Sequence, residues 1–330
     1  MGDIFGLIIV RPFGLILMWI YQLVGSYGLA VILFAVLAKI ILFPLSYKSK
    51  KSMLKMNAVQ GRLQELQKKY ANNKVKLNEE MQKLYESEGV SPMSGCLPTF
   101  ITLPIMMGLY YAVQKPLTFM LGLGTADIAL LGNKVGIDVA TVAAKSATYQ
   151  LDIAQGLNKF VDASGAFSSD ILNLSENIKN LLIPIDFNFF GLDLSLTPHI
   201  SQPSVLWLIP ILSGLTAFLS SYIMQKMQKT QAAGSMKTML YMMPLMSVYF
   251  GFLFPASIGI YWVTNNILTT VQEYALTKYL NKRHPVLSDI EKRQKEQEEK
   301  RAAREEKIQR ITEEGARPDP NTSRKKRDKK

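Results

Sequence analysis

Long apolar runs alternate with polar stretches along most of this chain, and this alternation predicts membrane-spanning helices. A bilayer core about 30 Å thick requires roughly 20 apolar residues in one helix. Gly, Pro or Lys clusters close each run, as is common at the ends of membrane helices. The expected spans are residues 27–46, 96–121, 204–224, 236–254 and 256–280.

The N-terminal segment, residues 1–26, is also apolar, but Arg11 and Pro12 interrupt it. The part that remains is about a dozen residues long and too short to cross a bilayer. Trp19 and Tyr21 suit the headgroup region. We therefore predict an interfacial helix here, with a sixth span as the alternative. No small-residue cleavage site follows, so we expect no removable signal peptide.

Residues 47–95 show apolar positions at spacings of three and four on both sides of a polar turn at 71–74. This pattern predicts an antiparallel helical hairpin with a basic exterior. The segment is far longer than a connection between two spans requires, so we expect it to recruit a substrate or partner; a rigid connector is the simpler alternative. The candidate recruiting residues are Met56, Leu63, Leu66, Tyr70, Leu77 and Met81.

The distribution of charge predicts the orientation, because loops rich in Lys and Arg stay in the cytoplasm. Residues 48–88 hold ten basic residues and five glutamates, and the short connection after the third span, residues 225–235, carries Lys226 and Lys229 and is followed by Lys237. Residues 122–203 instead hold four lysines and eight acids. We expect the hairpin, the short connection and the C-terminus in the cytoplasm, and the 122–203 loop outside. With five spans the N-terminus also lies outside.

The C-terminal segment, residues 281–330, has too few aliphatic residues to bury a core and is predicted to be disordered or a solvated helix. From residue 282 it carries 17 basic and 11 acidic residues. Its terminal cluster can bind RNA phosphates or anionic lipid, or act only as a topology anchor. The cluster consists of Arg324, Lys325, Lys326, Arg327, Lys329 and Lys330.

Polar side chains inside the expected spans are the candidate functional residues. Lys39 lies six residues from the cytoplasmic end of the first span, which is about 9 Å deep at 1.5 Å per residue. An ammonium at that depth usually faces a cavity or a partner, although snorkelling is the alternative. Trp262, Asn266 and Thr269 share one predicted helix face. The further candidates for a hydrated groove are Ser213, Thr216, Ser220, Asn265 and Gln272.

Overall composition supports an integral membrane protein with basic soluble parts: 48% of the 330 residues are hydrophobic, and the formal net charge is +12. A single cysteine, and two histidines that both lie outside the apolar runs, argue against a metal site, and we expect no cofactor. No nucleophile–base pair or carboxylate dyad lies in the spans, so we expect no enzyme. A channel or secondary transporter remains the alternative, although no internal repeat is visible.

Several motifs in order resemble the YidC membrane protein insertases, in a compact five-span form. They are 39–45 (KIILFPL), 89–98 (GVSPMSGCLP), 103–105 (LPI), 109–110 (LY), 254–256 (FPA) and 261–263 (YWV). The resemblance extends over about residues 12–285, except for most of 122–185. The family's cation on the first span is usually arginine; Lys39 keeps the charge without the planar fork of donors.

The resemblance implies an all-α membrane protein whose five helices enclose a hydrophilic groove open to the cytoplasm and to lipid. It implies an insertase and chaperone of the plasma membrane, with nascent membrane proteins as substrates and no small-molecule substrate. Candidate partners are the Sec translocon, the signal recognition particle pathway, the ribosome and anionic lipids. Lys39 and Trp262 match the family's groove residues, whereas serines stand near Ser220 where glutamine is common.

Overall fold

The computed structural model describes residues 6–90, 97–228 and 234–283, so the tail cluster at 324–330 lies outside the described residues. The chain forms two compact units. The first comprises Met1–Lys50 with Met93–Thr277, and the second comprises Lys51–Pro92 with Lys278–Lys330.

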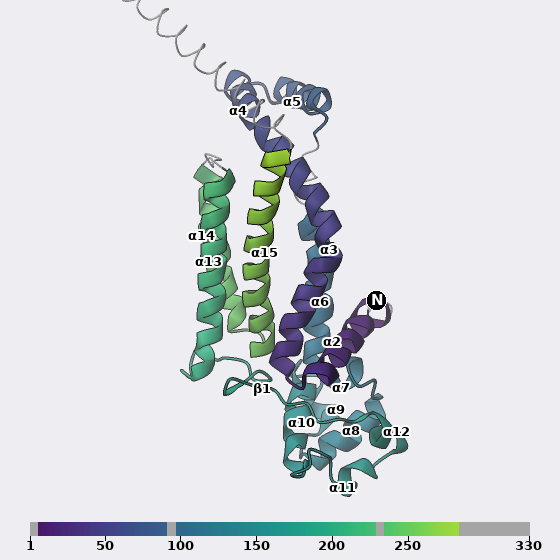
Figure 1. The fold of residues 1–330 in the computed structure, drawn as a ribbon. Helices are drawn as coiled ribbons and strands as arrows, with labels where there is room; N and C mark the ends of the chain where they lie inside the picture. Colours follow the sequence, from purple (N-terminus) through teal and green to yellow (C-terminus); the bar gives the residue numbers. More distant parts are fainter. Residues whose placement is uncertain (1–5, 91–96, 229–233, 284–330) are drawn as a thin grey trace, which may run out of the picture. The chain divides into compact units, whose positions relative to one another are not determined.

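Among the described residues, five helices are 18 residues or longer, and they run side by side in the first unit (Figure 1). By length and apolar composition, two described stretches could cross a membrane, Tyr27–Asn57 and Val205–Met227. The five-span count therefore stays a prediction. The helices are α3 (Tyr27–Ala58), α6 (Leu97–Gln114), α13 (Leu208–Gln228), α14 (Gly234–Gly251) and α15 (Ala256–Arg283).

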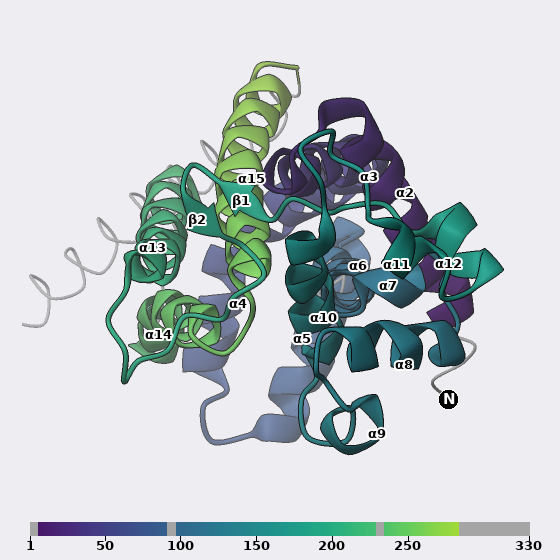
Figure 2. The same cartoon turned by 90° about the horizontal axis from the view of Figure 1, so that it is seen from below.

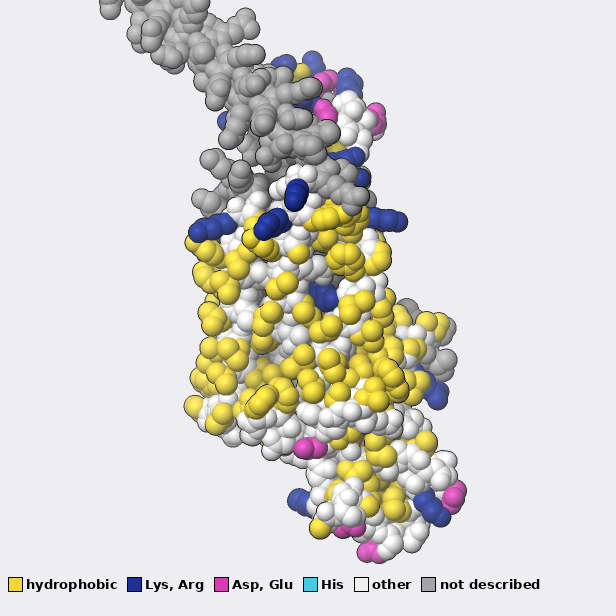
Figure 3. All heavy atoms as spheres, in the orientation of Figure 1, with side chains coloured by type: hydrophobic (Ala, Val, Ile, Leu, Met, Phe, Trp, Pro, Cys, Tyr) yellow, Lys and Arg dark blue, Asp and Glu magenta, His cyan; other side chains and the backbone are white. Residues whose placement is uncertain are grey.

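The outer surface of these helices is apolar, as expected for contact with lipid. Leu215 of α13, Leu245 of α14 and Val271 of α15 are each more than half exposed. Figure 3 shows the resulting band of hydrophobic side chains, with few charged groups inside it. A soluble protein rarely exposes so large an apolar surface. Inside the bundle, a methyl group on Gly214 of α13 would overlap Val248 of α14, so a small residue permits close helix packing.

The bounds of two helices differ most from the expected spans, by more than five residues at one end. α3 contains Pro44 and continues beyond residue 46 to Ala58 without a break. α6 ends at Gln114 instead of continuing to 121, and the short helix α7 (Pro116–Phe119) follows. The physical reason is Pro116, which has no N–H group and disfavours helical dihedral angles at Lys115.

The N-terminal segment forms a π-helical turn, η1 (Gly6–Val10), and then α2 (Arg11–Val24), which ends at Gly25 with a left-handed cap. The 14 residues of α2 extend about 21 Å. Leu17 and Tyr21 are buried, and α2 packs against α6 and α7. Trp19 and Leu23 are exposed on the other side. This second apolar face fits the predicted interfacial helix, which stays a prediction.

Residues 122–203 fold into short elements around a core that is continuous with the helix bundle. Asp127 is buried and accepts hydrogen bonds from the Ser175 hydroxyl (2.7 Å) and the Asn177 amide (3.2 Å). Buried Gln150 donates to Thr118 Oγ1 at 2.9 Å, which ties this segment to α7. The elements, seen from below in Figure 2, are α8 (Thr125–Lys134), α9 (Val139–Val142), α10 (Tyr149–Leu157), η3 (Asn158–Phe160), α11 (Ser169–Leu172), α12 (Glu176–Leu181), β1 (Asn188–Phe189) and β2 (Leu192–Asp193).

The described helices of the second unit include α4 (Gln60–Lys69) and α5 (Lys74–Glu88), which pack together as the predicted hairpin. Asn73 caps α5 by accepting a hydrogen bond from the Lys76 N–H at 3.0 Å. Arg62 near the start of α4 forms an ion pair with Glu88 at the end of α5, as an antiparallel arrangement requires.

Candidate functional site

Helix α15 carries polar side chains toward two neighbouring helices, α3 and α13. On the α3 side, the Lys39 ammonium donates a hydrogen bond to Thr269 Oγ1 at 2.7 Å. Thr269 in turn donates to the backbone carbonyl of Asn265 at 2.6 Å. Among the residues that the structure describes, Lys39 has no carboxylate within ion-pair distance. The cation is thus held inside the bundle by a neutral hydroxyl group.

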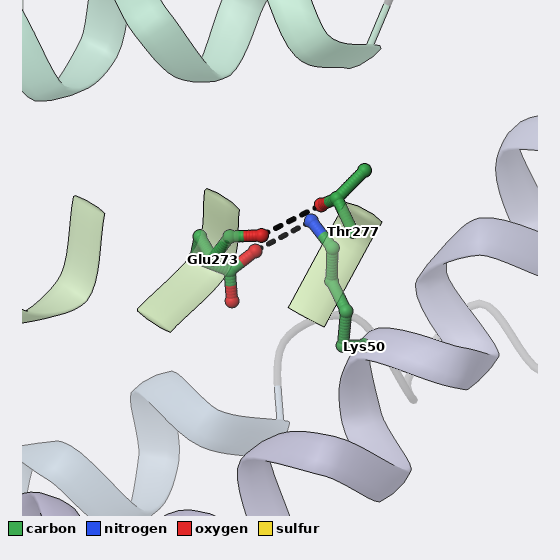
Figure 4. A network of polar contacts seen from close by, with 3 residues as sticks. All are labelled: Lys50, Glu273 and Thr277. Atoms are coloured by element: carbon green, nitrogen blue, oxygen red, sulfur yellow. Dashed lines mark hydrogen bonds and ion pairs between the residues drawn. The ribbon is translucent and has the colours of Figure 1, made fainter. Parts of the chain in front are cut away.

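A second lysine of α3 has a different partner. Lys50 Nζ lies 2.5 Å from Glu273 Oε2, and the two side chains are 2% and 18% exposed. Thr277 donates to the Glu273 backbone carbonyl at 2.7 Å, as Figure 4 shows. Glu273, the carboxylate nearest to Lys39 along the predicted spans, therefore pairs with Lys50 instead. Sequence reasoning missed this pair because its members lie on different helices and 223 positions apart.

On the other side of α15, hydrogen bonds connect it to α13. The Asn266 amide donates to Thr216 Oγ1 at 3.2 Å and to the Ser213 carbonyl at 3.4 Å. One helical turn further, Thr270 donates to Ser220 Oγ at 2.8 Å. We call the residues through which α15 is hydrogen-bonded to α3 and α13, with Ser213 contributing its backbone carbonyl, the polar seam: Lys39, Ser213, Thr216, Ser220, Asn266, Thr269 and Thr270.

The exposure of the polar seam is intermediate. Lys39, Thr269 and Asn266 are half-buried, whereas Ser213 is fully buried. The seam brings together six predicted site residues and adds Thr270, which sequence reasoning missed. The signal that could have identified Thr270 is its position four residues after Asn266, which places both residues on one face of the helix. The predicted residues Asn265 and Gln272 are also half-buried on α15.

Trp262 belongs to an aromatic stack instead of the polar seam. Its ring stacks on Phe250 (5.8 Å between centroids) and on Phe254 (6.0 Å). Tyr110 of α6 meets Phe254 edge to face at 5.0 Å. The predicted face of Trp262, Asn266 and Thr269 thus reaches three neighbours, α14, α13 and α3. The reason is that α15 packs between these helices, so small angular differences select different partners.

In the hairpin, part of the predicted recruiting stripe is the hairpin's own core. Leu63 is buried in a cluster with Val59 and Val90, and Met56 and Met81 pack against it. Leu66 and Leu77 lie outside this cluster and are half-buried. Tyr70 lies beneath the ammonium groups of two lysines at 5.3 and 5.6 Å. These three residues are the part of the stripe that remains available to a partner.

Among the residues that the structure describes, no three or more His, Cys, Asp or Glu side chains form a group that could hold a metal ion. The chemistry of the polar seam is that of one ammonium, several hydroxyls and amides. Such groups can solvate or pair with a polar segment.

Comparison with known families and proteins gives a consistent result. The family described as 60Kd inner membrane protein matches residues 19–284. The chain is 29% identical over 261 residues to "Membrane protein insertase YidC" of Pelodictyon phaeoclathratiforme, covering 79% of this chain and 34% of that protein. It is 26% identical over 255 residues to "Membrane protein insertase YidC" of Fusobacterium nucleatum, covering 77% and 88%.

A chloroplast protein is also similar: "ALBINO3-like protein 1, chloroplastic" of Arabidopsis thaliana is 29% identical over 264 residues, covering 79% of this chain and 45% of that protein. A solved structure, "Active YidC insertase crystal structure with the first transmembrane domain resolved", matches with a TM-score of 0.45 and 20% identity, over 82% of this chain and 45% of that one. The chain spans between about a third and nearly nine-tenths of these relatives' lengths.

Proposed function

Because this chain belongs to the 60Kd inner membrane protein family, that of the YidC insertases, we propose that it inserts nascent membrane proteins into the bilayer and assists their folding. The polar tail of the substrate passes along the polar seam, which forms one wall of a hydrophilic groove open to the cytoplasm and to lipid. No covalent bond is made or broken, and the function is not enzymatic.

The observation that carries this proposal is the difference between Lys39 and Lys50. Glu273 neutralises Lys50, whereas the described partner of Lys39 is the neutral Thr269 hydroxyl. An ammonium inside an apolar bundle is stabilised when a negatively charged group comes close to it. A carboxylate on the tail of a substrate supplies that charge.

The physical benefit is a lower barrier to crossing. Each unsatisfied polar group in hydrocarbon costs several kcal/mol. Hydroxyls, amides and one cation in the seam offer hydrogen bonds and counter-charge over part of the path. The apolar segment of the substrate then partitions into lipid, and this transfer drives the remaining movement.

The same proposal assigns a location, an orientation and partners to the other segments of the chain. The protein resides in the plasma membrane with the hairpin and the C-terminus in the cytoplasm and residues 122–203 outside. Leu66, Tyr70 and Leu77 of the hairpin receive substrates. The basic tail that ends at 324–330 contacts the ribosome or anionic lipids, and the Sec translocon and the signal recognition particle pathway are candidate partners.

The test is insertion of a single-span substrate with an acidic tail into vesicles that contain the purified protein. Lys39→Arg is expected to retain activity, because it retains the charge. Lys39→Ala and Lys39→Gln are expected to lose at least tenfold in insertion rate. A substrate whose tail lacks acidic residues should suffer less from either change.

Lys48→Gln is the matched control, since Lys48 is an exposed lysine of the same helix. It should insert substrates like the parent. Equal activity of Lys39→Ala and the parent on the acidic substrate would show that Lys39 only snorkels. Ion currents or solute uptake by the purified parent, without insertion, would favour a channel or transporter.

A further inference from the structure

The hairpin of β1 and β2 has a phenylalanine where its backbone disfavours one. Phe189 pairs with Leu192, and the two residues between them, Phe190 and Gly191, have φ angles of 52° and 80°. Two-residue hairpin turns with positive φ values strongly favour Asn, Asp and Gly. A bulky residue in the left-handed region is strained, and such strain tends to persist where it serves a function.

The side chain of Phe190 is 90% exposed. It touches the Phe189 ring edge to face, with 4.7 Å between the ring centroids. This residue therefore gains little from burial, although its backbone is strained. An apolar environment outside the chain would explain both the exposed ring of Phe190 and its strained backbone.

The hairpin lies where three long helices begin, as Figures 1 and 2 show. A methyl group on Gly28, the second residue of α3, would overlap the Phe189 ring. The carbonyl of Leu194 accepts a hydrogen bond at 3.1 Å from Ser257, in the first turn of α15. β2 also contacts η4 (Val205–Trp207), which leads into α13. The hairpin is thus fixed at the level where the apolar surfaces of these helices start.

Exposed apolar residues continue from this level onto α13. Ile200 is 62% exposed and Val205 is 74% exposed. Leu208 and Ile211 follow on α13 and are also exposed. Val205, Leu208 and Ile211 lie in Val205–Met227, one of the two stretches that are long and apolar enough to cross a membrane. Ile200 precedes this stretch. The surface around the hairpin is therefore continuous with the lipid-facing surface of the bundle.

From these observations we infer that the β1–β2 hairpin is an interfacial membrane anchor. Phe190 inserts into the phospholipid layer on the side of the membrane where α3, α13 and α15 begin. The ring occupies the boundary between headgroups and acyl chains, where aromatic side chains are favoured. This inference concerns contact with lipid and does not depend on the insertase proposal.

The test uses a nitroxide spin label on the full chain in phospholipid vesicles. Cys96 is replaced by serine, and Phe190→Cys is labelled. The matched control is Lys145→Cys, an exposed position in the same outer segment. Collision rates with oxygen, which concentrates in lipid, and with a water-soluble nickel chelate report the environment. We expect the label at 190 to favour oxygen severalfold and the label at 145 to favour nickel.

Two results would overturn the inference: a label at 190 that favours nickel as the control does, or a label shielded from both reagents, which would indicate contact with a second copy of the chain. Phe190→Asn provides an independent readout. Asparagine suits the turn, so a purely local role predicts unchanged or slower amide exchange at residues 188–193 in bilayer discs. Membrane anchoring predicts faster exchange there, because the lipid contact is lost.

Discussion

Two lysines of α3, about three helical turns apart, are expected to respond to substitution in opposite ways. Lys50 and Glu273 form a largely buried ion pair. Removal of one partner leaves the other charge uncompensated, which typically costs about 3–5 kcal/mol. We expect Lys50→Met or Glu273→Gln to lower the thermal midpoint of unfolding clearly. The double variant Lys50→Met/Glu273→Met should recover much of the loss.

Lys39→Met should behave differently, since it removes a cation whose described partner is a neutral hydroxyl. Its stability should match or exceed that of the parent, although insertion of acidic-tailed substrates fails. Lys48→Met provides the baseline, because Lys48 is exposed. If Lys50→Met unfolds like Lys48→Met in lipid-containing detergent, the ion pair contributes no stability.

One aspartate outside the helix bundle predicts a local dependence on pH. The Ser164 hydroxyl and the backbone N–H groups of Ala166 and Ser164 donate to the Asp162 carboxylate and lower its pKa. Because the folded pKa is depressed, this contribution to stability is present above the pKa of the unfolded chain and is lost as the pH falls through the folded pKa. Amide protection at residues 164–166, corrected for intrinsic exchange, should fall in that range. Asp162→Asn should abolish the dependence.

Among the elements, the apolar stripe of the α4–α5 hairpin divides into residues of the hairpin's own core and residues outside that core. Leu63 is buried in the hairpin core, so Leu63→Ala should destabilise the hairpin by about 2–5 kcal/mol and increase its cleavage by limited proteolysis. Leu77 lies outside this core. Leu77→Ala should therefore leave limited proteolysis of the hairpin unchanged but weaken the cross-linking of substrates to it. Normal insertion after deletion of residues 56–85 would make the hairpin a connector only.

Sequence periodicity was sufficient for elements with long or regular patterns. It predicted the hairpin, the turn before Asn73 and the main helices, because each contains several periods of apolar positions. The end of α6 at Gln114 was not predicted, although Pro116 and its restriction on Lys115 were the available signal. The compact fold of residues 122–203 was not predicted either, because its helices are short and its core residues come from separated segments.

The sequence identified the polar residues of the candidate site, but it did not identify the partner to which each of them is bound. Lys39, Asn266 and Thr269 stand out as polar residues in apolar runs, and the structure connects each of them to another helix or to its own backbone. The pairing of Glu273 with Lys50 depends on how α3 and α15 are placed side by side. No local pattern contains that information.

At the scale of the whole molecule, the distribution of charge predicts the orientation of the chain. Single cysteines in a Cys96→Ser background should react with a membrane-impermeant reagent from opposite sides at 48–88 and at 125–195. The positive charge of the first segment is expected to retain it in the cytoplasm. A cysteine at Asp3 should react on the same side as 125–195 if the chain has five spans. Reaction there from the cytoplasmic side would indicate six.

The aromatic stack of Phe250, Phe254 and Trp262 has a consequence for the electrical insulation of the membrane. A row of hydroxyls and amides through a bilayer offers a route for protons, and each elementary charge that crosses a potential of 100 mV dissipates about 2.3 kcal/mol. The stack lies beside the first turns of α15, between that helix end and the residues Asn266 and Thr270. Aromatic faces offer a proton no chain of donors and acceptors. Under the proposed function, the polar seam can therefore solvate a polypeptide part of the way through the membrane, while the aromatic stack denies protons a continuous route across it.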